Sequence, residues 1–129
     1  MTHEPNWILD SYWNETTGKN VSYLIRDYLK GRCKIRMAGD LHYYMRHSAV
    51  PSDKPIYVQH LIVNGCGGAF LHPTHAFKNF KKFDGASYES KATYPSYDDS
   101  SRVSWLHFPL LECLILLCHY FSLNLKLLA

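Results

Sequence analysis

The sequence predicts a mixed α/β fold, and the prediction depends on one helical pattern and two strand-like runs that follow it. Residues 20–31 carry apolar side chains at helical spacing. Residues 33–38 and 56–64 are short apolar runs, each followed by a glycine turn, as is typical of buried strands. A helix that leads into a strand, with a second strand further on, indicates a sheet covered by helices.

The helical pattern is a single apolar stripe. Asn20 is expected to cap the amino end of this helix, and Gly31 is expected to end it. The stripe itself falls at positions i, i+3, i+4, i+7 and i+8, which are Val21, Leu24, Ile25, Tyr28 and Leu29.

The two strand-like runs place polar residues at their ends. The first, Cys33 to Ala38, ends at Gly39, so Asp40 and His42 are expected in the loop that follows. Pro51 to Pro55 is a turn-rich break. The second run, Ile56 to Asn64, is followed by three glycines within residues 65–68, which indicates positive φ or a close backbone approach.

Bulk composition is that of one globular domain. The chain has 129 residues, of which 47% are hydrophobic and 15% aromatic. A formal net charge of +3 does not require a nucleic-acid partner, and none is expected. Four cysteines occur without a CxxC pair, so neither a zinc ribbon nor a thioredoxin-type motif is indicated. The first residues lack the basic and apolar regions of a signal peptide, and the localisation stays open.

Residues 78–102 are polar and are expected to be irregular. They begin with a basic cluster, Lys78, Lys81 and Lys82 around Phe80. Charge runs are usually solvated surface, so that interpretation is favoured over a phosphate-binding patch.

Residues 103–129 form a leucine-rich tail, expected to be helical and either buried or interfacial. Its uncharged run from Cys113 to Leu125 is shorter than the about 20 residues that a membrane span needs, although association with a membrane through residues 105–129 stays an alternative. Val103-Ser104 is the dipeptide that a consensus splice-donor sequence encodes. Translation from an intron is therefore a second hypothesis for the origin of the tail.

Several short motifs carry a family resemblance over about residues 1–102. They are Thr2-His3-Glu4-Pro5, Gly39-Asp40-Leu41-His42 with Tyr44 and Arg46 after it, NGCGGAFLHPTH at 64–75, SYESK at 87–91 and YPS at 94–96. In this order they resemble the calcineurin-like metallophosphoesterases, including the purple acid phosphatases, and most closely a plant-type branch of that family.

The resemblance implies a β-sandwich flanked by helices, of which this chain would be an incomplete C-terminal part. It implies two divalent metal ions (Mn, Fe or Zn) and a phosphate-ester substrate. By that likeness His3 and His42 are metal ligands, and Asp40 stands where the family has a histidine. Arg46 and His47 would lie near the substrate as candidate catalytic residues, with Arg46 suited to pair with a phosphate oxygen.

The same likeness shows what is missing. Three of the five ligand blocks of the family have no counterpart, and three donors cannot hold two ions. We therefore expect no two-metal catalysis from this chain alone, and an exposed sheet edge where a preceding strand would pair. The alternative is a non-catalytic protein, membrane-associated or interacting with a partner. His72, His75 and Cys66 supply only three ligands where structural zinc needs four, so loop histidines are favoured there.

Overall fold

The computed structural model describes residues 1–65 and 72–104. The described residues form both helices and strands, and the predicted mixed α/β class is confirmed at that level. The elements in chain order are α1 (Asn6–Trp13), α2 (Lys19–Tyr23), the π-helix η1 (Leu24–Tyr28), β1 (Ile35–Ala38), β2 (Tyr44–Ala49), β3 (His60–Asn64), the 3₁₀ helix η2 (Thr74–Phe77), β4 (Lys82–Phe83) and β5 (Ala86–Tyr94). Residues 97–104 are also helical.

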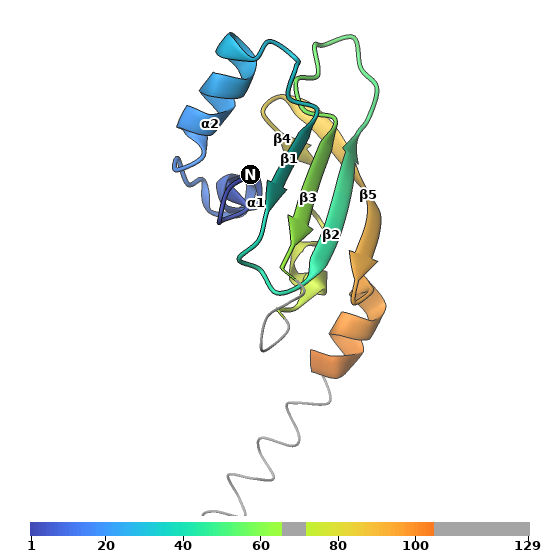
Figure 1. Cartoon of the computed structure of the whole chain (residues 1–129). Coiled ribbons are helices and arrows are strands. Elements are labelled where there is room, and N and C mark those ends of the chain that lie inside the picture. The colour runs from blue at the N-terminus through green and yellow to red at the C-terminus, as the bar shows by residue number, and fades with distance from the viewer. Residues whose placement is uncertain (66–71, 105–129) are drawn as a thin grey trace, which may run out of the picture.

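The strands form one five-stranded sheet in the order β1-β3-β2-β5-β4 (Figure 1). β1 and β3 are parallel, whereas β2 is antiparallel to both β3 and β5. The short β4 pairs with the start of β5 through a tight turn. The carboxyl ends of β1, β3 and β5 and the amino end of β2 therefore lie along the same edge of the sheet.

β1 lies at one edge of the sheet. A parallel bridge between Thr2 and Ala38 covers its carboxyl end. Two backbone hydrogen bonds hold this contact: Thr2 N–H donates to Met37 O over 3.0 Å, and Gly39 N–H donates to His3 O over 3.1 Å. In the described part of the chain nothing else pairs with this side of β1.

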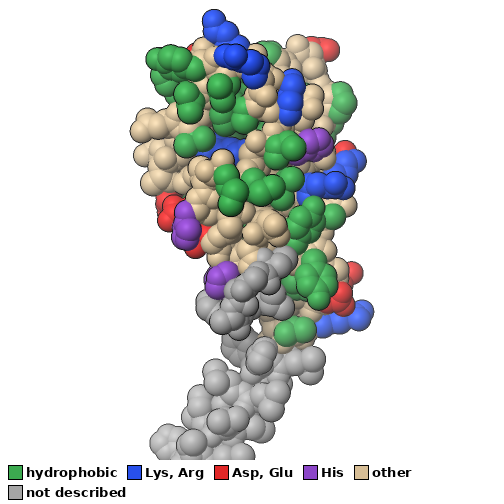
Figure 2. All heavy atoms as spheres, in the orientation of Figure 1, with side chains coloured by type: hydrophobic (Ala, Val, Ile, Leu, Met, Phe, Trp, Pro, Cys, Tyr) green, Lys and Arg blue, Asp and Glu red, His purple; other side chains and the backbone are tan. Residues whose placement is uncertain are grey.

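One face of the sheet is covered by the helices and carries the hydrophobic core. Trp7 and Ile8 of α1 and Met45 of β2 are fully buried there. Side chains alternate between the two faces along each strand, as the pleat requires. The opposite face carries partly exposed apolar groups, including Ile35 and Ile62, and Figure 2 shows hydrophobic side chains gathered over these strands.

The predicted helix at 20–31 is confirmed, with different ends. It begins at Lys19, so the predicted cap at Asn20 was wrong, and Gly18 takes the cap position without a side-chain hydrogen bond. A Cβ on Gly18 would lie 2.7 Å from Asn6 Cβ, so no larger residue fits that position. Ile25 is buried, whereas Leu24 and Tyr28 are exposed. Leu24 and Tyr28, at the two ends of the π-turn, therefore face solvent, whereas Leu29 after it is partly buried against the core.

Three strands were not predicted. β2 occupies residues that the resemblance treated only as a site segment. β4 and β5 lie within residues 78–102, where the prediction of irregular structure was wrong. Asp84 and Gly85, both with positive φ, form the turn between β4 and β5. Asp-Gly is a strong hairpin signal, so the sequence did contain the evidence for this pair of strands.

Arg36 joins the sheet to the helices from inside the core. Only 4% of the residue is exposed. Its guanidinium lies 5.3 Å from the ring centroids of both Trp7 and Phe83, and Nη1 donates to Ser22 Oγ over 3.2 Å. Burial lowers the pKa of Arg36, and the carboxylate of Asp84 opposes that shift. The aromatic faces thus partly replace the water that this cation has lost.

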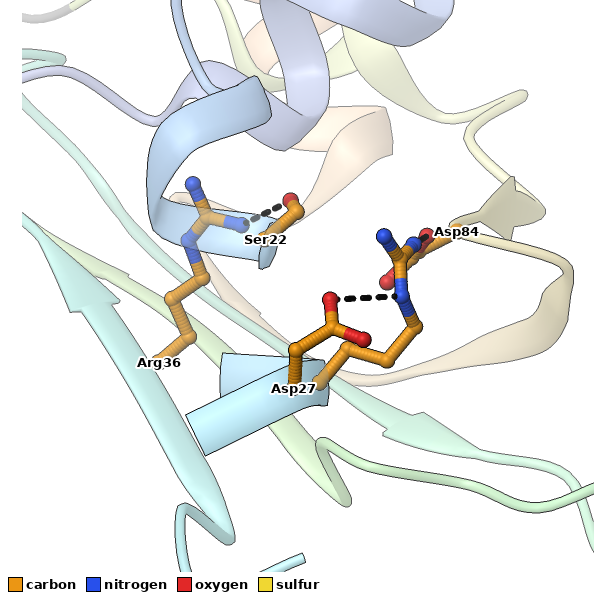
Figure 3. Close-up of polar contacts among 5 residues, drawn as sticks. Ser22, Asp27, Arg36 and Asp84 are labelled. Atoms are coloured by element: carbon orange, nitrogen blue, oxygen red, sulfur yellow. Dashed lines mark hydrogen bonds and ion pairs between the residues drawn. The ribbon is translucent and has the colours of Figure 1, made fainter. Parts of the chain in front are cut away.

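A second arginine, Arg26, is half-exposed at the surface, and its partners Asp27 and Asp84 are seen in Figure 3. Arg26 of η1 pairs with Asp27 over 3.2 Å and with Asp84 of the β4–β5 turn over 3.7 Å. Because both partners are partly solvated, this pair fixes geometry more than it contributes stability.

No helix among residues 1–65 and 72–104 is long and apolar enough to cross a membrane. Of the leucine-rich tail at 103–129, residues 105–129 lie outside the described residues, so the expectations for it, including its membrane association, stay predictions.

We predict that Arg36→Ala lowers the free energy of unfolding by about 2–4 kcal/mol, because it leaves a cavity between two aromatic rings and removes the bond to Ser22. Urea denaturation at neutral pH measures this. Arg102→Ala is the matched control, since Arg102 is exposed; its effect should stay within about 0.5 kcal/mol. Equal effects of the two variants would contradict the structural role of Arg36.

Candidate functional site

Two of the three predicted metal ligands lie close together at the carboxyl end of β1. His3 follows the Thr2–Ala38 bridge and Asp40 follows β1, and their Nδ1 and Oδ1 atoms are 3.8 Å apart. The side chains are 80% and 41% exposed, respectively. An exposed pair of this kind contributes little to stability, so its geometry matters more for what can bind to it.

Local backbone geometry directs Asp40 out of the strand. Its φ of 41° lies in the left-handed region, which Asp tolerates better than most residues. The hydrogen bond from Gly39 N–H to His3 O then fixes the two segments side by side. A carboxylate and an imidazole are thereby held at one solvent-accessible point, and both are common ligands of divalent ions.

His42, the third predicted ligand, contacts a histidine that was not assigned to this site. The backbone N–H of His42 donates to His72 Nδ1 over 3.0 Å, and the two ring centroids are 5.0 Å apart. Because His72 Nδ1 accepts, a neutral His72 carries its proton on Nε2 and is a donor there. His72 therefore supports the loop that bears His42, a role that spacing in the sequence did not indicate.

Gly65 sets the path of the same loop. A Cβ at this position would lie 2.0 Å from Leu41 O and 2.8 Å from Leu41 C. Gly65 N–H donates to Tyr43 O over 3.0 Å, and Tyr43 N–H donates to Leu41 O over 2.8 Å. The close backbone approach predicted for this glycine is confirmed, and the other glycines of the run lie outside the described residues.

The two candidate catalytic residues lie inside β2 and on opposite faces of the sheet. Arg46 is exposed on the open face of the sheet, which is the face away from the helices, and it pairs with Ile62 of β3 and Ala92 of β5. His47 is 1% exposed in the core, with its ring 4.9 Å from that of Phe80. In the described part of the chain, no hydrogen bond or ion pair joins Arg46 or His47 to His3 or Asp40.

Burial controls the chemistry of His47. It lowers the pKa of the imidazole to about 4. Nε2 is buried without a hydrogen-bond partner among residues 1–65 and 72–104. The ring is therefore neutral at physiological pH and behaves as a core side chain.

His75 and His72 have separate contacts. His75 Nδ1 lies 2.9 Å from Ser100 Oγ, and Thr74 Oγ1 donates to Pro95 O over 3.1 Å. These bonds attach η2 to the start of the 97–104 helix. Cys66, the third residue of the group considered for zinc, lies outside the described residues, so the choice of loop histidines over a zinc site stays a prediction.

Within the described ranges, no group of three or more His, Cys, Asp or Glu side chains is arranged to hold a metal ion. His3 and Asp40 are a pair of donors and do not complete a coordination shell. Comparison with protein-family models, with curated proteins and with solved structures found no match for this chain.

We predict that the stability of the protein falls as the pH drops from about 6.5 to about 4 through His47. Its pKa is about 4 in the folded state and 6.5 for an unperturbed histidine, so the unfolded chain binds the proton first. Above pH 6.5 this difference in pKa leaves the stability unaffected. Between pH 6.5 and pH 4 it lowers the free energy of unfolding by roughly 3 kcal/mol in total. His47→Leu should show a correspondingly shallower pH dependence in urea titrations, and an unchanged slope would contradict the buried neutral ring.

We also predict that Gly65→Ala lowers the free energy of unfolding by more than about 2 kcal/mol, because the new Cβ would collide with the backbone of the 39–42 loop. Gly39→Ala is the control, since a Cβ there meets nothing within 4 Å; its effect should stay within about 1 kcal/mol. Thermal or urea unfolding distinguishes the two variants. If both are tolerated equally, the loop does not pack on Gly65 as described.

Proposed function

We propose that this chain contributes the ligand-bearing edge of a metal-dependent phosphoesterase, with His3, Asp40 and His42 as ligands. The observation that carries the proposal is the meeting of His3 and Asp40, which are far apart in the sequence and 3.8 Å apart in space. Their backbones are joined by the bridge to β1, so the pair is built by the sheet and not by chance contact of long side chains.

The chemistry of the donors suits a divalent cation. A carboxylate and an imidazole favour Mn, Fe or Zn, and a bound ion of this kind polarises a phosphate ester and lowers the pKa of bound water. Asp40 is a harder, anionic donor than the histidine that stands there in the resembling family, which favours Mn over softer ions. The exposure of both side chains leaves room for additional ligands.

The number of donors limits what the chain does by itself. A paired-metal site requires more ligands than His3, Asp40 and His42 provide, and these three are not arranged as one group. We therefore propose that ligands beyond those three are needed for hydrolysis, and that the chain alone has no two-metal activity.

A second candidate is a non-catalytic interaction protein that keeps this partial fold. It is favoured by the open face of the sheet, where Ile35 is 53% exposed and Tyr94 at the end of β5 is 67% exposed. Large exposed apolar surface is typical of a binding face. Metal binding discriminates between the two proposals, because only the first requires it.

We predict that the protein binds one Mn²⁺ weakly and that Asp40→Asn or His3→Ala weakens binding about tenfold or more, a loss of ~1.4 kcal/mol or more. Isothermal titration with MnCl₂ measures this, and Asp53→Asn, at an exposed carboxylate outside the site, is the control.

Equal losses for Asp40→Asn and Asp53→Asn would point to non-specific ion binding and contradict the site. In parallel, the protein alone should not hydrolyse bis-p-nitrophenyl phosphate above the rate of the buffer with Mn²⁺. Robust hydrolysis would overturn the claim that further ligands are required.

A further inference from the structure

The basic cluster of residues 78–82 lines a cavity on the side of the molecule formed by β4 and β5. Lys78, Lys81 and Lys82 all border it, and its volume is about 350 Å³. Ligand pockets in proteins begin at roughly this size, so the cavity suits a small ligand. All three lysines are exposed, as expected for a charged surface segment, and they border one cavity.

Backbone contacts fix the positions from which these lysines extend. Lys82 pairs with Ser87 in the β4–β5 ladder, and Lys81 O accepts the N–H of Tyr88 over 2.8 Å. Lys78 ends η2, where its N–H donates to His75 O over 3.4 Å.

The wall of the cavity is partly aromatic. Phe80 and Tyr88 border it and are only 2% and 5% exposed. Tyr88 Oη donates to Val58 O over 2.9 Å, which fixes the ring in the core. An anchored wall of this kind reduces the entropy that a ligand site loses on binding.

The charges of the cavity are unbalanced. Within residues 1–65 and 72–104, none of the three lysines forms an ion pair. Glu89 is the one acidic residue that borders the cavity, and its carboxylate already pairs with Lys91. Three like charges around one cavity repel each other, and an anion between them relieves that repulsion.

Two hydroxyl groups add hydrogen-bonding capacity. Ser87 and Ser90 of β5 also border the cavity. Ser90 Oγ accepts a hydrogen bond from Tyr97 Oη over 3.1 Å, so its own hydrogen is available to a ligand. Ammonium groups and hydroxyls are the donors that phosphate oxygens accept from.

We propose that this cavity binds a small anion with two or more linked phosphate groups, held by Lys78, Lys81 and Lys82. Lysine ammoniums are compact point charges on flexible stems, so three of them suit a chain of phosphates better than one planar carboxylate. The site is separate from the His3–Asp40 pair and does not depend on metal binding there.

The test is a titration of the full chain with inorganic tripolyphosphate. Binding is measured by calorimetry and by changes in amide chemical shifts. Lys78→Gln/Lys81→Gln/Lys82→Gln should weaken binding at least tenfold. Lys19→Gln/Lys30→Gln/Lys34→Gln removes the same charge from exposed positions elsewhere and should change it less than about twofold. Shifts should concentrate in residues 78–90.

Equal losses in the two triple variants, or shifts spread over the whole surface, would overturn the proposal in favour of non-specific charge attraction. Vesicles of phosphatidylcholine with a phosphorylated phosphatidylinositol separate the free anion from a lipid headgroup. Binding to vesicles without binding to tripolyphosphate would also overturn the proposal. Circular dichroism of each variant checks that the fold is kept.

Discussion

The parallel pairing of β1 with β3 is the constraint on which the candidate site depends. Because these strands run in the same direction, the segments that leave them emerge at one edge of the sheet. The bridge from Thr2 to Ala38 extends that arrangement by one position and brings His3 beside Asp40. Gly65, which follows β3, then allows the 39–42 loop to cross directly over the backbone. The site thus follows from strand direction and from one residue without a side chain.

The interior distributes polar groups differently from the edge. Arg36 and His47 are both buried, and each is accommodated by aromatic neighbours instead of by a buried counter-ion. Arg36 stays a cation between two rings, whereas the lowered pKa keeps His47 neutral. At the edge, His3 and Asp40 keep their contact with water. Groups that support the fold are therefore withdrawn from solvent, and groups suited to bind an ion are presented to it.

Part of the fold and part of the site could be predicted from the sequence. The helix near residue 20 and the strands β1 and β3 follow from apolar periodicity, because their buried side chains leave a regular trace in the sequence. β5 left a weaker trace, since only Tyr88 of its nine residues is buried, and Asp84-Gly85 was the better signal. The likeness to a family placed His3 beside Asp40. The support of His42 by His72 could not be predicted, because it depends on how a distant loop folds back.

The central claim is that His3 and Asp40 form the cation-binding point of this chain, and the position of a bound ion tests it most directly. Substoichiometric Mn²⁺ broadens the amide signals of nearby residues in nuclear magnetic resonance spectra. The account predicts that residues 2–4 and 39–42 broaden first. Broadening that begins instead around Asp53 and Asp84, which border a separate cavity of about 660 Å³, would contradict it. Uniform broadening over the whole chain would contradict it equally.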